Sequence, residues 1–106
     1  MDDNGFYVYN MYTRRFESVD STKVTINSHP QFDFFAHKAI YNDGFNVTEA
    51  ITGSAVSVAF TSKEEAIDFA THKLSKITDD EFTKLIVDKI KIYGISPRYL
   101  SKVLPC

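Results

Sequence analysis

The sequence predicts an α+β fold, in which helices pack on one face of an antiparallel sheet. Residues 6–60 alternate between apolar and polar side chains with a period of two, which is typical of half-buried strands. From residue 62 onward the apolar residues recur every three or four positions, which is typical of helices. In a chain of 106 residues, this order predicts a single domain with about five strands, two helices and a short third helix.

The first expected strand covers residues 6–16, where Phe6 and Val8 lie on one face. The opposite face carries Tyr7, Tyr9 and Met11. Residues 19–23 ("VDSTK") are expected to form a turn that leads into a second strand over residues 23–27.

Residues 33–60 are expected to form a three-stranded meander. Asp43 and Gly44 favour a hairpin turn, because both residue types tolerate the positive φ that such a turn requires. Residues 52–54 ("TGS") predict a second tight turn. Residues 31–41 fit either a strand or a helix, and both alternatives stay open at this point.

Two capping-box patterns mark the starts of two helices. Ser62 and Glu65 form the first pattern, and Thr78 and Glu81 form the second, so the first helix should end near residue 77. The expected inner faces consist of Ile67, Ala70, Leu74 and Ile77 in the first helix, and of Phe82, Leu85, Ile86, Ile90 and Tyr93 in the second.

The segment "YGISPRYLSKVL" (residues 93–104) predicts the end of the second helix, a turn and a short third helix. Gly94 suits a C-cap, because a left-handed conformation costs glycine little. Ser96 suits an N-cap, and Pro97 suits the first position of a helix over residues 97–104, because proline has no N–H to lose there.

The same segment resembles the turn and recognition helix of repressor-type helix-turn-helix units. The matching positions are Gly94, Ile95, Ser96, Pro97, Tyr99, Leu100, Ser101 and Val103. The resemblance implies a DNA-binding unit over residues 79–104. The DNA-contacting residues that it implies are Ser96, Arg98, Ser101 and Lys102. One departure is Ile90, which stands where such units usually have Ala or Gly to allow close helix packing.

Charge is unevenly distributed along the chain. The formal net charge is −2; residues 1–72 carry 5 Lys/Arg against 10 Asp/Glu, whereas residues 73–106 carry 7 against 4. Nucleic-acid binders usually show a concentrated basic surface. Most of this protein would repel phosphate, which argues against strong charge-driven DNA binding.

The cysteine content and the apolar runs indicate a cytoplasmic protein. Cys106 is the only cysteine, so no intramolecular disulfide can form, which suits a reducing compartment. The first residues lack the basic flank and apolar run of a signal peptide. No run approaches the roughly 20 apolar residues of a membrane helix, so we expect no membrane association.

No group of residues has the spacing of a catalytic or metal-binding site. His29, His37 and His72 are far apart and have no cysteine at ligand spacing. The acidic residues of 63–65 and 78–81 fall in the first turns of helices, where they complement the helix dipole. We therefore expect no enzymatic activity, no cofactor and no metal.

The leading hypothesis is a small non-enzymatic binding module that acts by protein–protein contact. It would be an inhibitor or adaptor of the kind found among phage and other mobile-element accessory proteins. The chain has six tyrosines, and those left at the surface could serve as contact residues. The expected contact residues are Tyr7, Tyr9, Tyr12, Glu17, Asp20 and Glu49, together with Asp2 and Asp3.

The expected partner is another protein, including one that itself binds nucleic acid. An exposed sheet edge would also favour a homodimer. The alternative hypothesis is a DNA-binding transcriptional regulator that uses residues 79–104, with the sheet as a dimerisation platform.

Overall fold

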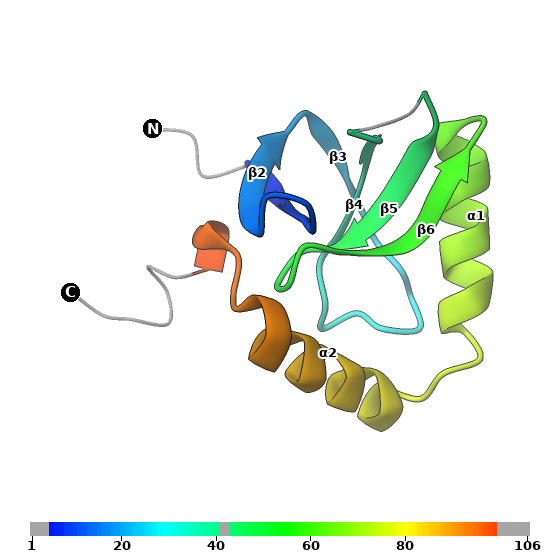
Figure 1. The fold of residues 1–106 in the computed structure, drawn as a ribbon. Helices are drawn as coiled ribbons and strands as arrows, with labels where there is room; N and C mark the ends of the chain where they lie inside the picture. Colours follow the sequence, from blue (N-terminus) through cyan, green and yellow to red (C-terminus); the bar gives the residue numbers. More distant parts are fainter. Residues whose placement is uncertain (1–4, 41–42, 100–106) are drawn as a thin grey trace.

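The computed structural model describes residues 5–40 and 43–99 and confirms the α+β fold (Figure 1). Within these ranges the elements are β1 (Phe6–Asn10), β2 (Arg15–Val19), β3 (Ser21–Val24), β4 (Phe34–Lys38), β5 (Phe45–Glu49), β6 (Ser54–Phe60), α1 (Lys63–Leu74) and α2 (Asp79–Tyr93). The strands form two antiparallel sheets, a β1–β2 hairpin and a four-stranded sheet of order β3-β4-β5-β6, rather than one sheet of about five strands. No helix in the described part of the chain is long and apolar enough to cross a membrane.

The expected single strand over residues 6–16 is instead two strands joined by a turn. The side-chain Oδ1 of Asn10 accepts a hydrogen bond from the backbone N–H of Tyr12 at 2.9 Å. The backbone N–H of Arg14 donates to the Asn10 carbonyl at 2.7 Å, and Arg14 has a φ of 59°. The chain therefore reverses over residues 11–14, because the asparagine side chain stabilises a turn in place of a continued strand.

The chain passes from the first sheet to the second through Asp20 alone. The expected turn over residues 19–23 is therefore wrong, since these residues belong mostly to β2 and β3. The meander over residues 33–60 is confirmed as β4, β5 and β6. It also settles the open alternative for residues 31–41, because β4 is a strand.

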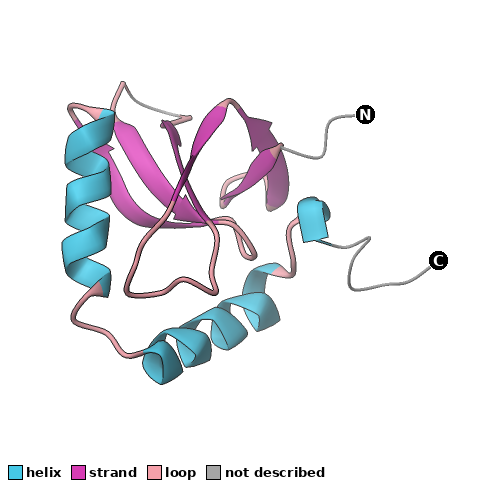
Figure 2. Ribbon diagram, turned by 180° about the vertical axis from the view of Figure 1, so that it is seen from behind, coloured by secondary structure: helices cyan, strands magenta, loops and turns pink. Residues whose placement is uncertain are grey.

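The two helices cover one face of the four-stranded sheet, and the β1–β2 hairpin covers part of the other face (Figures 1 and 2). On the helical face α1 lies along the sheet, while α2 crosses its end. The buried core on that side consists of Val24, Ile26, Phe34, Ala36, Val47, Ala66, Ala70, Leu74, Phe82 and Ile86. The core under the hairpin consists of Phe6, Val8, Phe35 and Ala50, and the rings of Phe6 and Phe35 stack at 4.7 Å.

The structure confirms both predicted helix starts. The Thr78 hydroxyl accepts from the Glu81 N–H at 3.1 Å, and the Glu81 carboxylate accepts from the Thr78 N–H at 3.0 Å, so this capping box is complete. The Ser62 hydroxyl accepts from the Glu65 N–H at 3.1 Å. The Glu65 carboxylate bonds to the Thr61 hydroxyl, so α1 has only one half of the box.

The end of α2 also follows the prediction. Gly94 is the C-cap with a φ of 88°. The Ser96 hydroxyl accepts from the backbone N–H two residues on, at 3.3 Å, and residues 97–99 are helical. The rest of the helix predicted over residues 97–104 lies outside the described residues. Leu85, expected on the inner face of α2, is 46% exposed, because α2 crosses the end of the sheet and buries only a narrow stripe.

A buried carboxylate holds the turn between β5 and β6. Glu49 is 1% exposed, and its carboxylate accepts from the backbone N–H groups of Ile51 and Thr52 at 2.5 and 3.0 Å. It also accepts from the Thr52 hydroxyl at 2.7 Å. Burial raises the pKa of Glu49, and the bonds from Thr52 and Ile51 oppose this effect by favouring the charged form.

The same turn accepts hydrogen bonds from β1 and from the segment that follows α2. The carbonyl of Gly53 accepts from the N–H of Tyr9 in β1 at 2.9 Å. The carbonyl of Ile51 accepts from the N–H of Ser96, beyond α2, at 2.7 Å. The β5–β6 turn therefore links the hairpin, the sheet and the C-terminal segment.

The residues after α2 pack against β1 and β4. The Arg98 guanidinium lies 4.1 Å from the centroid of the Phe6 ring and donates to the carbonyl of Gly5 at 2.8 Å. The Tyr99 hydroxyl donates to the Asp33 carboxylate at 2.9 Å. Burial, with a contribution from this bond, raises the pKa of Tyr99 to about 12.

We expect Gly53→Ala to destabilise the protein by at least about 3 kcal/mol, because it combines overpacking with backbone strain. A Cβ at this position would lie 2.6 Å from the backbone nitrogen of Tyr9, and Gly53 has a φ of 69°. Urea denaturation measures the loss.

The matched control is Gly94→Ala. Gly94 also has a positive φ, but a Cβ there would meet nothing within 4 Å. Its loss should be limited to backbone strain of about 1–3 kcal/mol, because Gly94, with φ 88° and ψ −164°, lies in a region that almost only glycine adopts. Equal losses for the two variants would contradict the close approach of β1 to the turn.

Candidate functional site

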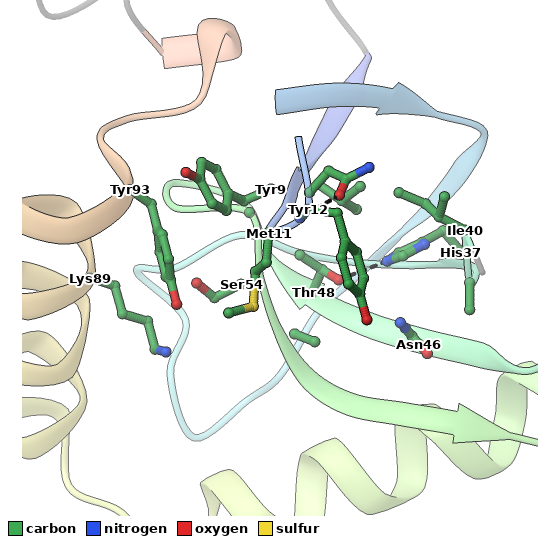
Figure 3. Close-up of a pocket in the computed structure, with 15 residues that line it drawn as sticks. Tyr9, Met11, Tyr12, His37, Ile40, Asn46, Thr48, Ser54, Lys89 and Tyr93 are labelled. Carbon is green, nitrogen blue, oxygen red and sulfur yellow. Dashed lines mark hydrogen bonds between the residues drawn. The ribbon is translucent and has the colours of Figure 1, made fainter. Parts of the chain in front are cut away.

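The hairpin covers only part of its face of the sheet, and the uncovered part forms a cleft of about 360 Å³ (Figure 3). His37 of β4 and Asn46 and Thr48 of β5 line the floor of the cleft. The walls come from β1 and the turn after it, from the two residues that follow β4, from the β5–β6 turn and the start of β6, and from α2. The wall residues used below are Tyr9, Met11, Tyr12, Ile40, Lys89 and Tyr93.

The floor of the cleft contains a histidine whose two ring nitrogens are both engaged. His37 is 3% exposed, and its Nδ1 lies 2.9 Å from the carbonyl oxygen of Lys38. Since a carbonyl can only accept, Nδ1 carries the proton, and in the neutral ring Nε2 accepts from the Thr48 hydroxyl at 2.7 Å. Burial lowers the pKa of His37. The floor therefore holds a neutral, internally paired imidazole.

Packed tyrosines form the wall between β1 and α2. The Tyr9 and Tyr93 rings lie 4.4 Å apart between centroids, and the Phe16 ring meets Tyr9 edge-on at 5.2 Å. The Lys89 ammonium lies 5.7 Å from the centroid of the Tyr93 ring, within range of a cation–π interaction. These contacts fix α2 against the hairpin, although the two segments are far apart in the sequence.

Two exposed side chains overhang the cleft from the β1–β2 turn. Met11 is 68% exposed and Tyr12 is 85% exposed. The Asn10 side chain stabilises this turn. Its Oδ1 accepts from the backbone N–H of Tyr12, and its Nδ2 donates to the Glu17 carboxylate at 2.8 Å. The turn therefore presents apolar and aromatic groups to solvent from an ordered backbone.

The structure brings some of the predicted contact residues together. Tyr9 and Tyr12 line the cleft, and Glu17 supports the turn that carries Tyr12. Tyr7 is half-buried on β1, and Asp20 is exposed between β2 and β3; neither lines the cleft.

Glu49 requires a correction, because it is buried and cannot belong to a contact surface. The prediction assumed one solvated sheet face, whereas residues 47–50 are buried on both faces. The Glu49 carboxylate instead caps the β5–β6 turn. Asp2 and Asp3 lie outside the described residues.

The DNA-contacting residues implied by the helix-turn-helix resemblance are also placed differently from the expectation. Ser96 is fully buried, because its N–H bonds to the β5–β6 turn. The guanidinium of Arg98 is engaged with Gly5 and Phe6. Ser101 and Lys102 lie outside the described residues. Neither described residue presents its side chain as a groove-reading group would.

The cleft also contains residues that sequence reasoning missed as a site. Lys89 and Tyr93 are one helical turn apart on α2. This spacing indicates that they share a helix face, but it does not identify the segment against which that face packs. The alternating pattern predicts a strand at Met11, and the sequence shows no partner for His37. Among the described residues, no three His, Cys, Asp or Glu side chains lie close enough together to hold a metal ion.

The buried imidazole predicts a pH dependence of stability. Folding lowers the pKa of His37. As the pH falls below about 6.5, the imidazole of His37 is therefore protonated in the unfolded chain before it is protonated in the folded protein. The free energy of unfolding should therefore decrease as the pH falls, because protonation of His37 favours the unfolded chain. Glu49, whose pKa is raised, contributes with the opposite sign, because the folded protein takes up the Glu49 proton before the unfolded chain does.

The comparison of wild type with His37→Gln isolates the histidine, because Glu49 is common to both. Denaturant titrations at several pH values between 7 and 5 should show a shallower loss of stability in the variant. Parallel curves would contradict the buried neutral imidazole.

No family model matches the chain, and no curated protein or solved structure matches it either. Functional conclusions therefore depend on the geometry of the cleft.

Proposed function

We propose that the protein is a small binding module that recognises a segment of another protein in the cleft and catalyses no reaction. The observation that carries this proposal is the pair Met11 and Tyr12, which are strongly exposed on an ordered turn above a cleft. Aromatic residues and methionine are enriched in protein interfaces. Because the turn is already ordered, binding would cost little conformational entropy.

The chemistry of the floor supports binding over catalysis. A general base needs a nitrogen or oxygen atom that can reach the substrate proton. The Nε2 of His37 accepts from the Thr48 hydroxyl, and these two residues are only 3% and 1% exposed, so a substrate could reach little of either side chain.

The size of the cleft supports contact with a short segment. A volume of about 360 Å³ is near the lower end of ligand pockets and can hold one or two side chains. A module with one such contact surface could act as an inhibitor or as an adaptor. The absence of an intramolecular cysteine pair is consistent with action in the cytoplasm, and the role that we propose is of the phage-accessory type.

Replacement of both Met11 and Tyr12 by serine should abolish partner capture while the protein remains folded. Removal of exposed interface anchors commonly costs at least about 1–2 kcal/mol each, which is a tenfold or greater loss of affinity. The measurement is capture by the immobilised protein from a lysate of the source organism, with the retained proteins identified by mass spectrometry.

The matched control is Val58→Ser. Val58 is 56% exposed on β6 and does not line the cleft. It should retain any partner that the wild type retains. Equal retention by the wild type, the control and the Met11/Tyr12 variant would show that the cleft is not the contact surface.

A further inference from the structure

We infer that the segment recognised by the cleft is acidic, with a carboxylate next to an apolar or aromatic side chain. This inference rests on the proposed function and specifies the chemistry of the partner.

The first observation is the charge of the cleft. The whole chain carries 14 acidic and 12 basic residues. Among the described residues that line the cleft, however, none is Asp or Glu, and Lys89 is the charged one. Apart from its ammonium group, the lining is apolar or uncharged. A cationic cleft in an acidic protein is complementary to a negatively charged ligand group.

The second observation is that donors remain available in the cleft. The Oδ1 of Asn46 accepts from the backbone N–H of Ala59 at 2.8 Å, which fixes the amide orientation and leaves its Nδ2 hydrogens for a ligand. His37 adds no donor, because its Nδ1 hydrogen is already used by Lys38. Lys89 and Asn46 lie toward opposite ends of the cleft (Figure 3). A carboxylate near Lys89 and a peptide carbonyl near Asn46 would satisfy both donors.

The third observation is the apolar surface between these donors. Met11 and Tyr12 lie between Lys89 and Asn46, and Ile40 adds a 41% exposed side chain at the Asn46 end (Figure 3). The thioether of methionine adapts to different apolar shapes and makes favourable contacts with aromatic rings. The cleft therefore suits a leucine, methionine or phenylalanine beside the acidic residue.

A protein segment fits these features better than a nucleic acid does. Nucleic-acid affinity comes largely from several cationic contacts to phosphates. Lys89 offers one such contact, and the protein carries a net charge of −2. One carboxylate next to an apolar group needs only one lysine.

Chemical-shift mapping on the ¹⁵N-labelled full chain can test this inference. The probes are three blocked tetrapeptides with leucine and phenylalanine at the two central positions. The two flanking residues are glutamate in the first peptide, glutamine in the second and lysine in the third. We expect the glutamate peptide to shift the amide signals of Met11, Asn46 and Lys89, and to bind at least fivefold more tightly than the glutamine peptide. The lysine peptide should bind most weakly, and added salt should narrow the differences.

Charge reversal in the cleft should invert the peptide preference. Lys89→Glu should favour the lysine peptide, and Lys89→Met should make the three affinities similar. The control is Lys91→Glu, because Lys91 is exposed on α2 and does not line the cleft. This variant should keep the wild-type order. Inversion by Lys91→Glu as well would overturn a specific role for Lys89.

The outcomes separate the inference from the proposed function. If the glutamate and glutamine peptides shift the cleft signals with equal affinity, the acidic preference is wrong while the cleft remains a peptide site. If no peptide shifts these signals at millimolar concentration, both proposals fail. If an oligothymidylate shifts the same signals more strongly than the glutamate peptide, the partner is a nucleic acid and the inference is wrong.

Discussion

The fold depends on one buried interaction, the capping of the β5–β6 turn by the Glu49 carboxylate. A buried carboxylate loses its hydration, which is costly unless hydrogen bonds replace it. Here two backbone N–H groups and the Thr52 hydroxyl replace part of that hydration, although burial still raises the pKa of Glu49. Two carbonyls of this turn accept backbone hydrogen bonds: the Gly53 carbonyl from the N-terminal hairpin, and the Ile51 carbonyl from the C-terminal segment. One side chain thus orders the turn that joins the sheet, the hairpin and the C-terminal segment.

The position of the cleft follows from this arrangement. Because β1 docks on the Gly53 carbonyl, the hairpin covers Phe35 and Ala50 but stops short of the rest of that sheet face. The turn that follows β1 then projects over the uncovered part (Figure 3). The C-terminal end of α2 closes the side of the cleft through the contact of Tyr93 with Tyr9. The site is thus the space that the hairpin and α2 leave over the sheet.

Features encoded by neighbouring residues could be predicted from the sequence, whereas features that depend on distant segments could not. The capping box at Thr78 and the helix end at Gly94 are local, and both were predicted correctly. The turn at Asn10 is a local exception: asparagine favours such turns, but the alternation of apolar and polar residues continues through it and indicates a single strand. The sequence suggested Glu49 as a contact residue, because the alternation of apolar and polar residues cannot reveal that both faces of the sheet are covered at this position. The contact of Lys89 with the cleft depends on tertiary packing alone.

Native-state hydrogen exchange most directly tests the claim that the β5–β6 turn unites the three segments. The informative amides are those of Tyr9, Thr52 and Ser96, which bond to the turn or lie within it. If the turn is the common attachment point, the three amides should exchange through one opening, with the same free energy and the same dependence on low concentrations of urea. Exchange of Tyr9 or Ser96 through a separate, lower-energy opening while Thr52 stays protected would contradict the account.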